Sequence, residues 1–192
     1  PELAMTLNNL ATLYRKEGRR TQAESLYQRA LRINEQALGP AHPEVALVQN
    51  NLAALYREQG KHAQAEPLYQ QALRIREQVL GPEHPHVAFS LNGLADVYTE
   101  QEKYAQAEPL FQRALQIREQ ALGPEHPEVA FLLRDLARLY TKQVEHARAK
   151  PLYKRALHIC EQRLGLAHPE TVQVRKAYDA CARTEKSGQC MR

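Results

Sequence analysis

The sequence has no tryptophan, few aromatic residues of any kind, and no long uninterrupted run of apolar residues. A membrane-spanning helix needs roughly 18 or more such residues in a row, so no membrane span is predicted. A basic segment followed by an apolar one, the mark of a secretory signal, is also missing from the start. We therefore expect a soluble, cytoplasmic protein that does not engage membranes. The chain opens at Pro1 inside a helical pattern, which suggests an excised piece of a longer protein.

Cysteine is scarce as well, with only three residues in 192. They are odd in number, and no pair has the spacing of a zinc site. Reduced thiols are therefore expected, and neither a metal nor a cofactor is predicted. Cys181 falls where earlier repeats carry aliphatic residues, so it should act as a small core residue. The three positions are Cys160, Cys181 and Cys190.

The excess of positive charge is small, because 26 Lys and Arg face 22 Asp and Glu, for a net charge of +4. Such a balance does not by itself indicate nucleic-acid binding. Basic residues such as Arg32 and Arg74 are each followed three positions later by a glutamate, so local pairing should neutralise this face. An RNA-binding solenoid would need an unpaired basic stripe with stacking aromatic residues. RNA binding remains an alternative, but not the favoured one.

One octapeptide occurs in four similar copies at a spacing of 42 residues. Its first copy, residues 38–45, reads Leu-Gly-Pro-Ala-His-Pro-Glu-Val. Self-similarity at a fixed period of this size is typical of stacked repeat architectures. Residues 43–84 and 85–126 share 28 of their 42 positions by direct count. The later copies of the octapeptide begin at Leu80, Leu122 and Leu164.

Each copy of the octapeptide combines a helix stop with a helix start. Its glycine follows an apolar-periodic segment, where a residue that tolerates positive φ can close a helix. Its second proline suits the first position of the next helix, whose amide hydrogen would be unpaired anyway. Its histidine should have a structural role in the turn, because equivalent residues of stacked repeats lie on the order of 10 Å apart, too far to share one metal. These histidines are His42, His84, His126 and His168.

Each repeat contains two helical patterns separated by a short turn. The first repeat shows apolar residues at three- and four-residue intervals, a break at Gly18, and a second pattern over about residues 21–38. The glycine of this break is replaced by Glu102 and Val144 in the third and fourth repeats, so these turns must change geometry or accept strain. After residue 168 a first helix occurs without a second one. There Asp179 replaces an alanine, and this polar face is typical of a terminal cap.

The predicted fold is therefore all-α, a right-handed solenoid of antiparallel helix pairs in a single domain over residues 1–184. The repeats span about 1–42, 43–84, 85–126 and 127–168, and a capping helix spans 169–184. Residues 185–192 are expected to form a disordered tail.

The repeats resemble tetratricopeptide repeats, although their period of 42 residues lies nearer the HEAT range than the usual 34. The residue pattern decides between the two, because it matches the tetratricopeptide signature and length is easily altered by longer helices. Further motifs are similar to the 42-residue variant found in kinesin light chains, whose motor-binding heptad region has no counterpart here. The signature residues are Leu52, Ala53, Tyr56, Gly60, Ala65, Leu68, Tyr69, Ala72 and Leu73, and the further motifs are Leu7-Asn-Asn-Leu-Ala11, Ala65-Glu-Pro-Leu68 and Leu80-Gly-Pro-Glu-His-Pro85.

This resemblance implies that the first helices line a concave groove that receives an extended peptide of a partner protein. Successive Asn residues along the groove could hold a peptide backbone, because a carboxamide both donates and accepts hydrogen bonds. Arginine and lysine would favour an acidic ligand, and phenylalanine could anchor an apolar side chain. Alternatively, the Asn residues cap or tolerate a solvated face and the Phe rings pack between repeats. The candidate peptide-binding residues are Asn8, Arg15, Asn50, Arg57, Phe89, Asn92, Phe131, Arg134, Arg138 and Lys176.

No phosphate-binding glycine loop, nucleophile elbow or metal motif occurs in the sequence, so no enzymatic activity and no catalytic residue is predicted. The favoured function is a protein-interaction scaffold or adaptor that works as a monomer. Besides RNA binding, one further alternative stays open: the repeats could be the sensor region of a larger signalling ATPase.

Overall fold

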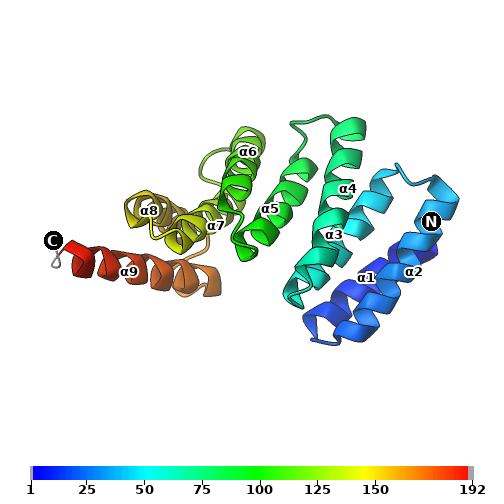
Figure 1. The fold of residues 1–192 in the computed structure, drawn as a ribbon, viewed down its shortest axis with the longest axis horizontal. Coiled ribbons are helices and arrows are strands. Elements are labelled where there is room, and N and C mark those ends of the chain that lie inside the picture. Colours follow the sequence, from blue (N-terminus) through cyan, green and yellow to red (C-terminus); the bar gives the residue numbers. More distant parts are fainter. Residues whose placement is uncertain (1, 190–192) are drawn as a thin grey trace. The chain divides into compact units, whose positions relative to one another are not determined.

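The computed structural model describes residues 2–189, and every regular element in this part of the chain is an α-helix (Figure 1). The predicted all-α fold of stacked helix pairs is confirmed. Two compact units, Pro1–Gln101 and Glu102–Arg192, are called unit 1 and unit 2 below. Unit 1 holds α1 (Glu2–Lys16), α2 (Arg20–Leu38), α3 (Pro43–Glu58), α4 (His62–Leu80) and α5 (Pro85–Glu100); unit 2 holds α6 (Tyr104–Leu122), α7 (Pro127–Lys142), α8 (His146–Arg163) and α9 (Pro169–Gln189).

The turn histidines are N-caps, which confirms their structural role. The ring Nδ1 of His42 accepts the backbone N–H of Glu44 at 3.1 Å, and His84 and His126 make the same contact with the second residue of their helices. Such a bond satisfies one of the amide groups that a helix start leaves unpaired. The glycines that end the preceding helices have positive φ, as predicted: Gly39, Gly81 and Gly123.

Each unit is built by two kinds of helix contact. Within a repeat the first helix packs on the second, as α1 does on α2, α3 on α4 and α7 on α8. Between repeats, each second helix packs on the next first helix, as α2 does on α3, α4 on α5, α6 on α7 and α8 on α9. Small residues such as Ala11, Ala23 and Ala30 are fully buried, which lets the helix axes approach closely.

The two turns that lack glycine keep the glycine-like backbone. Glu102 has φ of 60° and Val144 has φ of 62°, close to the 73° of Gly60 in the equivalent turn. A side chain with a Cβ is disfavoured in this region, and a β-branched one most of all. The sequence left two outcomes open at these positions, and the structure shows that the backbone geometry is kept and the strain accepted.

The last helix is longer than the sequence suggested. α9 continues to Gln189, so residues 185–189 of the predicted tail are helical, and residues 190–192, Cys190 among them, lie outside the described part. Extending an existing helix by one residue adds a hydrogen bond at little nucleation cost, and proline is absent from this stretch. Asp179 is exposed where Ala11, Ala53, Ala95 and Ala137 are buried, in keeping with a terminal cap, and Cys181 is buried as expected.

Candidate functional site

The candidate peptide-binding residues divide between the two units. Within unit 1, α1 contacts α3 and α3 contacts α5, so the rows of equivalent residues on these first helices run side by side. This arrangement brings together Asn8, Arg15, Asn50, Arg57, Phe89 and Asn92, whereas Phe131, Arg134, Arg138 and Lys176 belong to unit 2. We call the former set the unit 1 ladder.

Two of the three ladder asparagines already make hydrogen bonds between repeats. The buried Asn8 accepts a hydrogen bond on Oδ1 from Asn51 Nδ2 at 2.9 Å. Asn50 accepts on Oδ1 from Ser90 Oγ at 3.0 Å and from Arg76 Nη1 at 3.3 Å. These carboxamides therefore help to hold α1, α3 and α5 in register.

Asn92 differs from the other two ladder asparagines. Its Oδ1 atom is buried and has no hydrogen-bond partner within the described residues. A buried acceptor without a partner is unfavourable, and most such groups in proteins are satisfied by protein or water. Asn92 is thus the ladder asparagine whose side-chain acceptor is left unsatisfied within the described residues.

Arg76 on α4 is a component of the site that sequence reasoning missed. Its side chain is 4% exposed, and its Nη1 donates to three neutral acceptors: the backbone oxygen of His86 and Ser90 Oγ, both at 2.9 Å, and Asn50 Oδ1. Burial lowers the pKa of this guanidinium to about 10, and no carboxylate opposes that effect. Arg76 is therefore a buried cation that has no counter-ion among the described residues, and it lies next to the unit 1 ladder.

The missing counter-ion has a visible origin in the repeat alignment. The residue after the helix-starting proline is glutamate in four of the five first helices, Glu2, Glu44, Glu128 and Glu170, but it is His86 in α5. In unit 2, Arg118 occupies the position of Arg76 and pairs with Glu128 at 2.9 Å. Comparing the 42-residue repeats position by position would have found this exchange, but its meaning depends on the contact between the two helices.

Phe89 gives unit 1 an apolar surface group, since half of its surface (50%) is exposed. Its ring lies edge-on to His86 with centroids 6.2 Å apart, and His86 contacts His84 in the same manner at 5.0 Å. The predicted anchor is thus accessible, and it follows His86 by three residues on the same helix.

The two ladder arginines of unit 1 are already paired with acidic neighbours. Arg57 on α3 forms an ion pair with the buried Asp96 on α5, and Arg15 on α1 lies 3.9 Å from Glu58 on α3. Their charges are largely compensated within the protein. Arg76, in contrast, has only neutral acceptors among the described residues.

In unit 2, Arg134 bridges α7 and α9. It contacts the neighbouring Asp135 at 3.1 Å and Glu170 at 2.5 Å, and its guanidinium lies 5.6 Å from the centre of the Phe131 ring. Desolvation lowers the pKa of Arg134, but the two carboxylates outweigh it and hold the pKa above its ordinary value. Lys176 is exposed on α9 and Arg138 is half-buried on α7.

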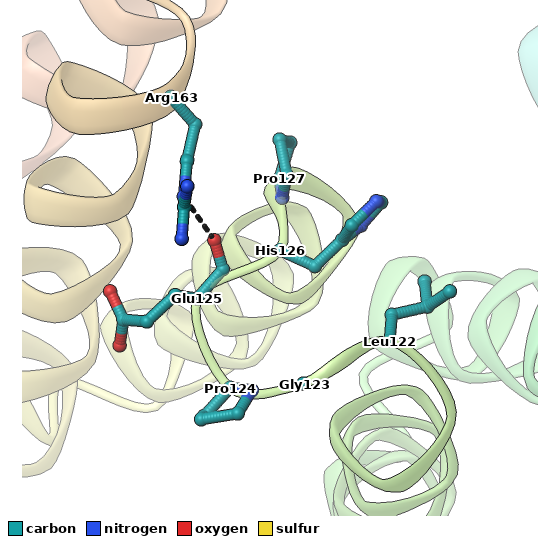
Figure 2. Close-up of a pocket in the computed structure, with 7 residues that line it drawn as sticks. All are labelled: Leu122, Gly123, Pro124, Glu125, His126, Pro127 and Arg163. Atoms are coloured by element: carbon teal, nitrogen blue, oxygen red, sulfur yellow. Dashed lines mark hydrogen bonds between the residues drawn. The ribbon is translucent and has the colours of Figure 1, made fainter.

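Unit 2 also contains a pocket of about 590 Å³, formed by residues 122–127 of the turn before α7 and by Arg163 at the end of α8. Figure 2 shows the Arg163 side chain reaching this turn, where its Nε donates to the Glu125 carbonyl at 3.3 Å. Arg155 donates to the Pro124 carbonyl at 3.1 Å. Both arginines thus fasten the turn to α8.

One expected feature of the second helices is not formed. Neither Arg32 nor Arg74 makes an ion pair with the glutamate three positions later in the described structure, and both side chains are exposed. Exposed pairs of this kind gain only a few tenths of a kcal/mol, so water competes successfully with the partner. The expected neutralisation by local pairing was wrong at these positions.

None of the described helices combines the length and apolar character needed to cross a membrane. A family model described as tetratricopeptide repeat matches residues 2–78, 44–120 and 87–162. No curated protein sequence matches the chain.

Solved structures with similar folds include repeat proteins of the kinesin light chain type. A Podosopora anserina protein, provisionally described as a kinesin light chain with nearly identical TPR-like repeats, superposes with a TM-score of 0.80 at 24% identity, covering 96% of this chain and 88% of that one. A variant form of the same protein gives 0.81 at 24% identity, with coverages of 96% and 87%. BtubC (BKLC) from P. vanneervenii gives 0.76 at 28% identity, with coverages of 99% and 81%.

Proposed function

This chain belongs to the tetratricopeptide repeat family, and from that premise we propose that the unit 1 ladder binds an extended, acidic segment of a partner protein. The fold is that of a protein-interaction scaffold, because stacked repeats present long surfaces rather than one enclosed cavity. Repeat scaffolds of this kind are typically non-catalytic. Which face of the repeats binds the partner protein, and which kind of peptide this face selects, are our proposal.

The observation that carries the proposal is the uncompensated charge of Arg76. A cation with no carboxylate partner, held in a poorly polarisable interior, projects a positive potential onto the nearby surface. An acidic group of a ligand bound near His86 would supply the counter-ion that Arg118 obtains from Glu128 in unit 2. Acidic character in the ligand would therefore raise both affinity and association rate.

Two further features support an extended peptide as the ligand. The unpartnered Oδ1 of Asn92 can accept a backbone N–H irrespective of the peptide's side chains. The half-exposed Phe89 can contact one apolar side chain. The contact with Asn92 does not depend on the sequence of the peptide, because it involves the peptide backbone. The contact with Phe89 and the charge of Arg76 would select peptides with an apolar and an acidic side chain.

The proposal is tested by screening a peptide library against the immobilised chain and measuring the affinity of selected peptides by isothermal titration calorimetry. We expect enrichment of Asp and Glu. Arg76→Met should weaken a selected peptide about tenfold or more, which corresponds to roughly 1.4 kcal/mol. Arg118→Met is the matched control, because it removes a buried arginine from the same repeat position in unit 2 and should leave the affinity unchanged. Equal losses in both variants, or enrichment of basic peptides, would contradict the proposal.

Asn92→Ala tests the backbone contact separately and should weaken binding by about 1 to 2 kcal/mol, the usual effect of leaving a desolvated peptide group unpaired. Asn50 is less suitable for this test, because its side chain also holds Arg76 and Ser90 and its loss would disturb the fold. Asn9→Ala is the control, since Asn9 is exposed on α1. If Asn92→Ala lowers the melting temperature and leaves affinity intact, Asn92 is structural.

A further inference from the structure

Tyr69 on α4 is a buried tyrosine whose hydroxyl group makes no hydrogen bond to any described residue. The tyrosines at the same repeat position in two other repeats both have a partner. The Tyr27 hydroxyl lies 2.8 Å from Thr12 Oγ1. The Tyr153 hydroxyl is hydrogen-bonded to Thr141. Polar groups in protein interiors are nearly always satisfied, so the Tyr69 hydroxyl is an exception within this chain.

The hydroxyl oxygen of Tyr69 is not sealed inside the protein, although only 2% of the residue is exposed. The described residues contain several fully buried side-chain atoms without a partner, such as Asn92 Oδ1, but the Tyr69 oxygen is not one of them. Because it also makes no hydrogen bond, it must keep contact with solvent. An accessible donor of this kind can bond a ligand without breaking any contact in the protein.

The glycine at position 93 explains why the Tyr69 ring lies where it does. A Cβ atom built on Gly93 of α5 would overlap the ring and lie 2.8 Å from the hydroxyl oxygen. The ring therefore brings its hydroxyl next to the backbone of α5, directly beside the ladder residue Asn92. The other first helices carry a side chain at this position: Asn9, Asn51, Asp135 and Ala177.

Two arginines of the unit 1 ladder lie close enough to influence the ionisation of Tyr69. Burial raises the pKa of Tyr69, and this effect is the largest. The positive charges of Arg57 and Arg15 oppose it, whereas the negative charge of Glu58 adds to it. Since the pKa is raised overall, the hydroxyl keeps its proton at neutral pH and can donate a hydrogen bond. The influence of both arginines also indicates that Tyr69 lies near the ladder.

Unit 2 shows that the fold does not require a hydroxyl group at this repeat position. Phe111 on α6 is the equivalent of Tyr69, and its side chain is completely buried. An aromatic ring without any polar atom therefore packs well there. The hydroxyl of Tyr69 is neither needed for packing nor used for a bond within the described chain, so it is available for a ligand.

We propose that the Tyr69 hydroxyl donates a hydrogen bond to a backbone carbonyl oxygen of the bound partner segment, an inference that rests on the proposed function of the unit 1 ladder. A backbone carbonyl fits best, because an acidic side chain would find a stronger partner in a guanidinium group. The bond complements Asn92, whose Oδ1 would accept a backbone N–H, since each peptide unit offers one donor and one acceptor. Tyr69 thus positions the segment without selecting its sequence.

The stability of the free chain gives a first test that needs no ligand. Tyr69→Phe should leave the melting temperature unchanged to within about 1 °C, because no bond within the chain is lost. Tyr27→Phe is the matched control at the same repeat position and should lower it by about 2 to 4 °C, because the bond to Thr12 is lost. Circular dichroism measures both variants. An equal loss in both would show that the chain itself uses the Tyr69 hydroxyl, and would overturn the proposal.

The second test measures the ligand contact by isothermal titration calorimetry, with the tightest-binding acidic peptide selected on the immobilised chain as the probe. Tyr69→Phe should weaken this peptide about three- to tenfold, and Tyr27→Phe should not. The loss should persist when each acidic residue of the peptide is replaced in turn by Ala, because the acceptor belongs to the backbone. If one replacement abolishes the effect of Tyr69→Phe, the acceptor is a side chain and the proposal is wrong.

The outcome for Tyr69 can be separated from the outcome for the proposed function. A peptide whose affinity falls with Arg76→Met but not with Tyr69→Phe would overturn the role of Tyr69 and leave the binding of acidic segments intact. A peptide with the opposite behaviour would support the contact with Tyr69 and contradict the role of Arg76. Selection of no acidic peptide would overturn both proposals.

Discussion

Arg76 in unit 1 and Arg118 in unit 2 occupy the same position of the repeat, and both side chains are buried, but their electrostatic surroundings differ. Arg118 pairs with Glu128, whereas Arg76 donates only to neutral acceptors because His86 stands where the glutamate would be. A single exchange of glutamate for histidine therefore leaves the buried arginine without the ion pair that its equivalent in unit 2 makes. In a repeat protein, the positions that depart from the common pattern are where a specific binding surface can arise.

A second difference between the units lies at position 93 of α5 and the equivalent position 135 of α7. Gly93 on α5 stands where α7 carries Asp135, and a Cβ atom placed on Gly93 would overlap the ring of the buried Tyr69. In unit 2 the residue equivalent to Tyr69 is Phe111, which lacks the hydroxyl. At this one contact, between α4 and α5, the Tyr69 ring occupies the space that a side chain at position 93 would need.

The largest effect is expected from Gly93→Ala, which tests this accommodation. Alanine favours helices more than glycine does, but the overlap with a ring that cannot move should dominate and destabilise the chain by about 2 kcal/mol. Urea unfolding followed by circular dichroism measures the change. Asn9→Ala is the matched control, because Asn9 has the same repeat position on α1 and is exposed, and it should be neutral. A neutral Gly93→Ala would show that Tyr69 has room to shift.

A pair of exchanges tests the electrostatic comparison directly. His86→Glu should give Arg76 a carboxylate and stabilise the chain by about 1 kcal/mol, a value reduced by solvent because the position is exposed. Glu128→His should remove the partner of Arg118 and destabilise by a similar amount. Thermal unfolding of both variants measures these effects. His86→Glu should also weaken binding of acidic peptides, and an unchanged affinity would mean that Arg76 does not attract the ligand.

The smallest effect is expected in the turns that replace glycine. Val144→Gly should stabilise the chain by about 0.5 to 1 kcal/mol, because relief of the strained backbone exceeds the entropy that glycine adds to the unfolded state. The Val144 side chain is 73% exposed, so little packing is lost. Gly60→Val is the converse change in unit 1 and should destabilise. Chemical unfolding measures the stability of both variants. A destabilising Val144→Gly would contradict the argument that the backbone at Val144 is strained.

Local sequence signals predicted the helices well because their causes are local. The glycine stop, the proline start and the 42-residue period each depend on the backbone preferences of a few neighbouring residues, and the helix bounds confirm them. The end of α9 was missed, since residues 185–189 are polar but contain no proline, and the helix continues through Gly188 to Gln189. Pairing of Arg32 and Arg74 with glutamates was also wrong, because solvent competes for exposed charges.

The candidate site was predictable only in outline. The rows of Asn, Arg and Phe residues follow from the repeat register, and their peptide-binding role stays a prediction. The hydrogen bonds of Asn8 and Asn50, the ion pair of Arg57 and the burial of Arg76 join residues that are 26 to 43 positions apart. Such contacts depend on how helices of different repeats meet.

The sequence by itself determined the repeat, the turns at which most helices begin and end, and a structural role for the turn histidines, because proline and glycine act on the backbone within a few residues. Only the tertiary structure decided which charges are compensated. The physical reason is that desolvation, ion pairing and burial depend on every helix packed around a side chain, as Arg76 and Arg118 show.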